Sequence, residues 1–116
     1  DMAYILRDKS FEFALKIIRL YKHLTEDKKE FVLSKQILRS GTSIGANVRE
    51  GKNAQSNSDF ISKYSIALKE ADETQYWIEL LYASQYIDQK SYESIDGDLK
   101  EIIAILTSSI KTVKSK

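Results

Sequence analysis

The sequence predicts an all-α protein, folded as an antiparallel up-down-up-down four-helix bundle in one domain that spans residues 1–116. Three observations predict this fold. The 116 residues include no proline and only four glycines, a composition that favours long helices over irregular loops. Apolar residues recur at spacings of three and four, and no stretch shows the period of two that is typical of a β-strand. Short polar segments separate four such regions, so consecutive helices are expected to pack in opposite directions.

The first helix is expected at residues 9–24. Its apolar residues form two adjoining faces that together cover an arc of about 220°, roughly twice what a surface helix needs for packing. The strip that remains polar consists of Glu12, Lys16, Arg19 and His23. Asp1, which precedes Met2, is expected to have no role.

Thr25 is expected to cap the second helix, with two carboxylates following it in the first turn. This helix is expected to continue to residue 47 or 48. The segment KNAQSNS, residues 52–58, is interpreted as a loop in which Ser56 or Ser58 caps the next helix.

The third helix has the most regular pattern, because its steps of four and three continue without a break. The residues at these steps are Phe60, Tyr64, Ala67, Ala71, Thr74, Ile78 and Leu81. Residues 85–91 are expected to form a turn, and a fourth helix repeats the same spacing from Tyr92 to Val113. Gly97 inside this helix costs about 1 kcal/mol relative to alanine.

The segment SGTSIGANVREG, residues 40–51, places glycines inside the second helix. Gly41 and Gly45 lie four residues apart, so they share one helix face and leave a shallow groove. Gly45 is expected near Tyr64 or Ser65 on the third helix. Gly41 is expected near Leu68. The groove is interpreted as a close helix contact, with a backbone-lined binding or oligomer contact as the alternative.

Ser40 and Asn47 lie on the same seam of the second helix, and they need hydrogen-bond partners if they are buried. Glu70 and Glu73 on the third helix are the expected acceptors. These four residues are interpreted as a buried polar layer that fixes helix register, rather than as a catalytic cluster.

No pattern indicates an enzyme. His23 is the only histidine, and the chain has no cysteine for a thiolate metal site. Glu70 and Glu73 lack the Glu-x-x-His pattern of di-iron bundles. We therefore expect no catalytic residue, no cofactor, no metal and no small-molecule substrate. No apolar run approaches the roughly 18 residues that span a bilayer, so we expect a cytoplasmic protein that does not enter a membrane.

Charge is distributed unevenly although the net charge is only +1. Residues 1–56 carry eleven Lys and Arg against seven acids, and residues 57–116 carry seven against ten. Four of these cations are expected within about 80° on the second helix, and two more lie on the polar strip of the first. Such a face can bind the phosphates of RNA or DNA. The six candidate residues are Lys16, Arg19, Lys28, Lys35, Arg39 and Arg49.

Two alternatives stay open for this basic face. It could be an ordinary solvated surface, and Arg39 could instead form an ion pair with Glu70 or Glu73.

Two stretches of the sequence carry a family resemblance: LSKQILRSGTSIGANVREG (33–51) and DFISKYSIALKEADETQYWIELL (59–81). Both resemble the bacterial 23S rRNA intervening sequence proteins, also labelled S23 ribosomal proteins. KSFEFALKIIRLYKHL (9–24) extends the resemblance over nearly the whole chain. It implies an up-down four-helix bundle and contact with rRNA or other RNA. The similar accessory variability protein of diversity-generating retroelements is a five-fold ring, which implies a pentamer. The resemblance supplies no catalytic residues.

The chain is therefore expected to be a non-enzymatic homo-oligomer that binds structured RNA or other nucleic acid. The apolar excess of the first helix, together with Trp77, Tyr82 and Tyr86, exceeds what one bundle can bury and predicts the oligomer. A protein-interaction or scaffold ring without nucleic-acid binding is the alternative.

Overall fold

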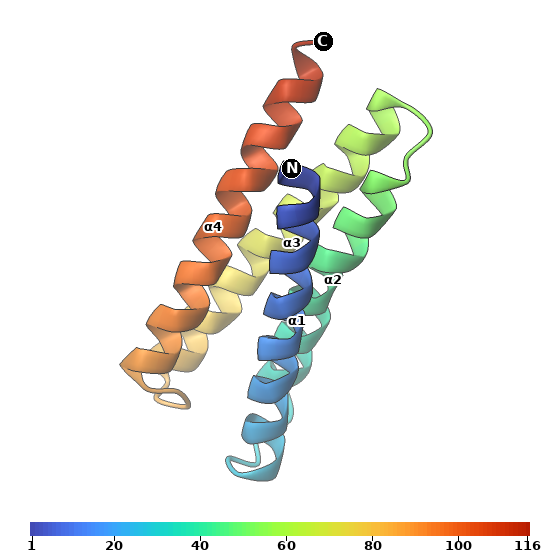
Figure 1. Cartoon of the computed structure of the whole chain (residues 1–116). Helices are drawn as coiled ribbons and strands as arrows, with labels where there is room; N and C mark the ends of the chain where they lie inside the picture. Colours follow the sequence, from blue (N-terminus) through green and yellow to red (C-terminus); the bar gives the residue numbers. More distant parts are fainter.

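The computed structural model describes residues 1–116, and it contains four α-helices and no strand. The helices are α1 (Met2–Glu26), α2 (Leu33–Lys52), α3 (Asn57–Ala83) and α4 (Gln89–Lys114). Consecutive helices run in opposite directions, and both chain termini lie toward the same end of the bundle (Figure 1). Contacts join α1 to α2, α2 to α3, α3 to α4 and α4 back to α1, so the helices surround one core. The predicted all-α antiparallel four-helix bundle is confirmed.

The core is one continuous cluster of apolar side chains from all four helices. On α3 the buried residues repeat the predicted steps, from Tyr64 to Leu81. On α4 the same holds from Ile95 to Leu106. Burial of each large aliphatic side chain contributes about 1.5–3 kcal/mol, so this cluster is the main source of stability.

The first helix begins at Met2 rather than at residue 9, because Asp1 caps it. The Asp1 carboxylate accepts hydrogen bonds from the backbone N–H groups of Ala3 at 2.9 Å and Tyr4 at 3.2 Å. These groups have no partner within the helix, and a carboxylate also suits the positive end of the helix dipole. The expectation that Asp1 has no role is wrong.

Thr25 does not cap the second helix, because α1 continues through it to Glu26. Its hydroxyl instead donates to the carbonyl of Tyr21 at 2.9 Å. The predicted start of the second helix is therefore wrong, and α2 begins at Leu33.

Glu30 supplies the missing cap of α2. Its carboxylate accepts from the backbone N–H groups of Val32 at 3.2 Å, Leu33 at 3.0 Å and Ser34 at 2.7 Å. Burial acts to raise the pKa of Glu30, but the hydrogen bonds from these backbone groups outweigh it and hold the pKa below its ordinary value.

The other two helix starts follow ordinary capping chemistry. Ser56 accepts from the backbone N–H of Asp59 at 3.0 Å, which confirms one predicted cap, and α3 begins directly after it. Asp88 accepts from the backbone N–H of Ser91 at 2.8 Å, so α4 begins at Gln89, inside the predicted turn.

Gly41 and Gly45 lie inside α2 as predicted, but they face α1. A Cβ atom on Gly41 would lie 2.9 Å from Cγ1 of Ile17, and one on Gly45 would lie 3.3 Å from the carbonyl oxygen of Ser10. The expected contacts of this glycine pair with α3 are wrong. The buried arc of α2 touches both neighbours, and residues 41 and 45 fall on its α1 side.

Gly51 is the glycine that faces α3. A Cβ atom there would lie 2.6 Å from Cδ1 of Tyr64. Residue 51 is displaced by about 80° from residue 41 around the helix, which places it on the α3 side.

Candidate nucleic-acid interface

The seam between α2 and α3 contains a buried polar contact, but its partners differ from those predicted. The hydroxyl oxygens of Ser40 and Thr74 are hydrogen-bonded at 2.9 Å, and the Thr74 hydroxyl also lies 2.7 Å from the carbonyl of Glu70. Asn47 donates to the carbonyl of Ser43 in its own helix at 2.9 Å. The polar layer is therefore smaller than predicted. It includes Thr74, which the sequence pattern had placed among the regularly spaced residues of the third helix.

The carboxylates of Glu70 and Glu73 bind Arg39. Nη1 of Arg39 lies 3.2 Å from Oε2 of Glu70, and Nη2 pairs with Glu73. Glu73 also accepts from Nε1 of Trp77 at 2.9 Å. The alternative considered for Arg39, an ion pair with Glu70 or Glu73, is therefore confirmed.

Lys16 is also paired within the chain. Its Nζ atom lies 2.6 Å from Oδ2 of Asp98 and donates to the hydroxyl of Ser94 at 2.9 Å. Two of the six candidate cations, Lys16 and Arg39, therefore join helices of the bundle.

Arg19 and Lys28 line two adjoining grooves near the start of α4. The groove beside Arg19 has a volume of ≈ 520 Å³ and includes Lys90 of α4. The groove beside Lys28 has a volume of ≈ 460 Å³, and His23 lines both. Lys28 was expected on the second helix, which is wrong because α2 begins only at Leu33.

Lys35 is exposed on α2. Like Arg19 and Lys28, it has no ion-pair partner within the chain.

Arg49 belongs to a group of cations that the sequence pattern did not reveal. It lines a depression of ≈ 220 Å³ with Arg7 of α1, and with Lys52 and Asn53 at the end of α2. None of the three cations forms an ion pair. Nζ of Lys52 lies 4.0 Å from the centroid of the Tyr4 ring, a cation–π contact between the two helices. We refer to Arg7, Arg49 and Lys52 as the basic cluster.

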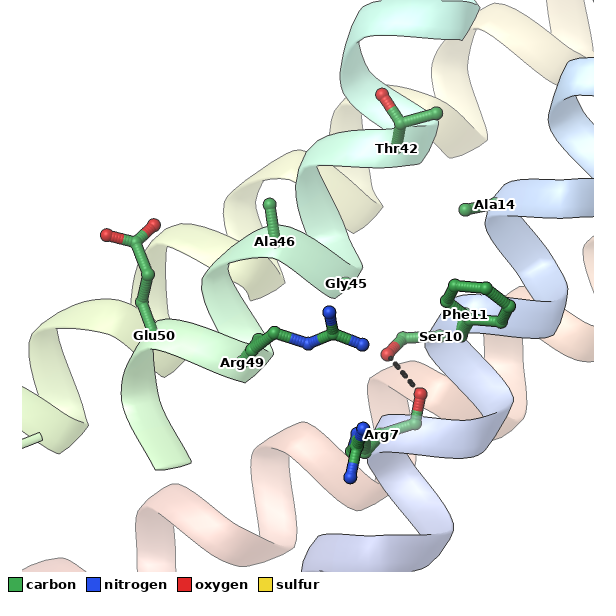
Figure 2. A pocket seen from close by; sticks show the side chains of 9 residues that line it. All are labelled: Arg7, Ser10, Phe11, Ala14, Thr42, Gly45, Ala46, Arg49 and Glu50. Carbon is green, nitrogen blue, oxygen red and sulfur yellow. Dashed lines mark hydrogen bonds between the residues drawn. The ribbon is translucent and has the colours of Figure 1, made fainter. Parts of the chain in front are cut away.

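The basic cluster adjoins a groove between α1 and α2, which has a volume of ≈ 380 Å³ and which we refer to as the α1–α2 groove. Gly45 and Ser10 lie where the helices approach each other, and the Arg49 side chain extends from α2 toward Ser10 and Phe11 (Figure 2). Phe11 is 51% exposed. Glu50, the one acid that lines the groove, points away from Arg49 in the same view, and its Oε1 atom lies 3.5 Å from Nζ of Lys63.

The aromatic residues expected to create apolar surface near the end of the third helix contact other side chains of the chain, although Tyr82 stays 37% exposed. Trp77 and Tyr86 are partly buried against the core. The rings of Tyr82 and Tyr92 stack with centroids 4.6 Å apart. Exposed large apolar side chains are concentrated on α1 and on the α1–α2 connection, and they include Tyr4, Ile5, Phe11, Phe31 and Val32.

The structure holds no group of three or more His, Cys, Asp or Glu side chains placed to bind a metal ion. None of the four helices combines the length and the apolar character needed to cross a membrane.

The family model described as 23S rRNA-intervening sequence protein matches residues 3–108. The chain belongs to this family. A crystal structure of a protein of unknown function from the S23 ribosomal protein family of Bacteroides thetaiotaomicron VPI-5482 is 58% identical, with a TM-score of 0.95. The alignment covers 96% of this chain and 99% of that chain. A comparison with curated proteins found no match.

Membership in the 23S rRNA-intervening sequence protein family confirms the resemblance seen in residues 33–51 and 59–81. The family is named for an element of ribosomal RNA and not for a reaction.

Proposed function

We propose that this 23S rRNA-intervening sequence protein is a non-enzymatic homo-oligomer that binds structured RNA. The observation that carries the proposal is the basic cluster, in which Arg7, Arg49 and Lys52 gather from two helices without an acidic partner. Neighbouring like charges repel one another, and a phosphate group placed between them turns this repulsion into attraction.

The proposed interface differs from the six residues selected on the sequence. It consists of Arg49, one of those six, together with Arg7 and Lys52. Arg19 and Lys28, which line grooves beside α4, and the exposed Lys35 are proposed as separate phosphate contacts, because none of them has an ion-pair partner. Lys16 and Arg39 are expected to contribute less, because Asp98 and the two glutamates of α3 already neutralise them. Such contacts position an RNA without reading its base sequence.

Assembly into a homo-oligomer is supported by apolar side chains that the single chain leaves exposed. At the α1–α2 connection, Phe31 is 58% and Val32 is 70% exposed. Surface of this kind often marks a protein–protein contact. A pentamer is proposed on the family resemblance. Several copies in one assembly would strengthen a weak contact per subunit through avidity.

A mobility-shift titration with a stem-loop RNA at two salt concentrations tests this function. At low salt, Arg49→Glu is expected to weaken binding by about tenfold, because it replaces an attraction to phosphate by a repulsion. Lys69→Glu is the matched control, since Lys69 is an exposed, unpaired lysine on α3, away from the basic cluster. It should leave the affinity within about twofold.

The same exposed apolar side chains favour a second candidate function, a scaffold ring whose partner is a protein. In that case light scattering would return an oligomer, but the wild-type protein would retain no RNA even at about 50 mM salt. That result would overturn the RNA-binding proposal.

A further inference from the structure

We infer that the α1–α2 groove holds an unpaired RNA base stacked on Phe11, while the basic cluster holds the adjoining phosphate. This inference rests on the proposed RNA binding and names the part of the RNA that the site takes, a single-stranded segment.

The size and lining of the groove suit a group as large as a nucleotide. Its volume of ≈ 380 Å³ lies within the range of about 300–1,000 Å³ that is usual for small-ligand sites. Phe11 stands on the α1 side, and the small side chains of Thr42 and Ala46 line the α2 side (Figure 2). Gly45 adds no side chain to this space, and a Cβ atom there would already be 3.3 Å from the backbone of Ser10.

Phe11 is free to stack on a ligand. Its side chain is 51% exposed, and it does not belong to the hydrophobic core. None of the three aromatic pairs in the chain includes it. A nucleobase placed on such a ring is held by stacking, with little dependence on which base it is.

The charges around the groove favour an anionic occupant. The groove and the neighbouring depression share Arg7 and Arg49, so a base in the groove would have its phosphate beside both guanidinium groups. Lys52 lies in the same depression. The Glu50 carboxylate does not oppose this arrangement, because it is turned away toward Lys63.

The combination of the Phe11 ring and the basic cluster selects unpaired nucleotides. In an RNA duplex the bases are stacked and paired inside the helix, so no base can reach a ring that lies between two α-helices. A loop, bulge or single-stranded end can turn a base outward. The basic cluster alone would still contact duplex phosphates, but more weakly than the combined site.

Fluorescence anisotropy with a single-stranded RNA oligonucleotide, and with a duplex of the same length, tests the inference. The wild-type protein is expected to bind the single strand more tightly. Phe11→Leu should weaken single-strand binding by about tenfold and leave duplex binding within about twofold. Tyr76→Leu is the matched control, because Tyr76 is an aromatic residue with a similar exposure of 55% but lies on α3, outside the groove. It should change neither affinity.

Three results would overturn the inference, and they are distinguishable. If the wild type binds both RNAs and Phe11→Leu leaves single-strand affinity unchanged, the stacking site is wrong while the proposed function stands. If the wild type binds neither RNA at low salt, the proposed function fails as well. If Phe11→Leu lowers the oligomer mass in light scattering, the groove is occupied by a second copy of the chain.

Discussion

Gly41 of α2 lies against Ile17 of α1 so closely that a Cβ atom on residue 41 would be 2.9 Å from Cγ1 of Ile17. The same helix pair approaches closely again one turn further on, where Gly45 faces the backbone of Ser10. These two contacts set the separation of α1 and α2. The α1–α2 groove opens beside them, so the packing of this helix pair also determines the shape of the candidate site.

The Gly41 contact predicts opposite effects for two glycine-to-alanine changes. Gly41→Ala should lower the free energy of unfolding by about 1–2 kcal/mol, because Ile17 is β-branched and moves aside only with strain. Gly97→Ala should raise it by up to about 1 kcal/mol, since a Cβ atom there meets nothing within 4 Å and alanine favours the helix. Urea denaturation measures both. A shift of the same sign in both variants would contradict the packing account.

The hydroxyl pair between α2 and α3 predicts energetic coupling. Thr74→Val keeps the shape of the side chain but leaves the buried Ser40 hydroxyl without its partner, at a cost of about 1–3 kcal/mol. Adding Ser40→Ala removes the unpaired group, so the double variant should lose less stability than the two single losses added together. A double-mutant cycle measures this difference, which should reach at least about 0.5 kcal/mol. Strict additivity would show that the two hydroxyls do not interact.

Charge reversal should affect the stability differently at two cations of α2, the paired Arg39 and the unpaired Lys35. Arg39→Glu places a third carboxylate beside Glu70 and Glu73, so it should lower the stability by about 1 kcal/mol or more. Lys35→Glu lies one turn away, on an exposed site without an ion pair, and should change the stability by less than about 0.5 kcal/mol. Thermal melts of the two variants make the comparison. Equal melting temperatures would mean that the Arg39 ion pairs contribute nothing measurable.

The Glu30 cap predicts a pH-dependent part of the stability. Because the folded-state pKa of Glu30 is lowered, its stabilisation is present above the unfolded-state pKa of about 4.3, and it is lost as the pH falls through the folded-state value. Glu30→Gln should therefore cost about 1 kcal/mol near neutral pH, and its difference from wild type should vanish in acid.

Denaturation at several pH values checks this prediction. Glu26→Gln is the control, because Glu26 is exposed at the end of α1, and it should stay within about 0.5 kcal/mol of wild type at each pH. A Glu30→Gln penalty that is constant down to the most acidic pH would show that the carboxylate charge is not what stabilises α2.

Local periodicity was sufficient to predict the fold. On α3 the spacing from Tyr64 to Leu81 identified the buried face, because side chains three and four residues apart share one side of a helix. The helix ends were harder to predict, since they depend on individual side chains that reach back to free backbone groups. Asp1 and Glu30 do this here, and they moved the starts of α1 and α2 in opposite directions.

The candidate site was only partly predictable for the same reason. Arg7 preceded the predicted first helix and Lys52 lay in the predicted loop, so neither was assigned to a helix face next to Arg49. The pattern also showed which arc of α2 is buried, but not which neighbouring helix touches each side of that arc. This is why Gly41 of α2 was expected to pack against α3 and is found packed against α1.

The salt dependence of RNA affinity tests the central claim, RNA binding by the basic cluster, most directly. The logarithm of the association constant should fall linearly with the logarithm of salt concentration. Each phosphate contact should add about 0.7–0.9 to the steepness of this slope. Replacing Arg7, Arg49 and Lys52 by glutamine should make this slope shallower by about 2 to 3, with helicity unchanged. A triple variant that keeps the wild-type slope would contradict the claim.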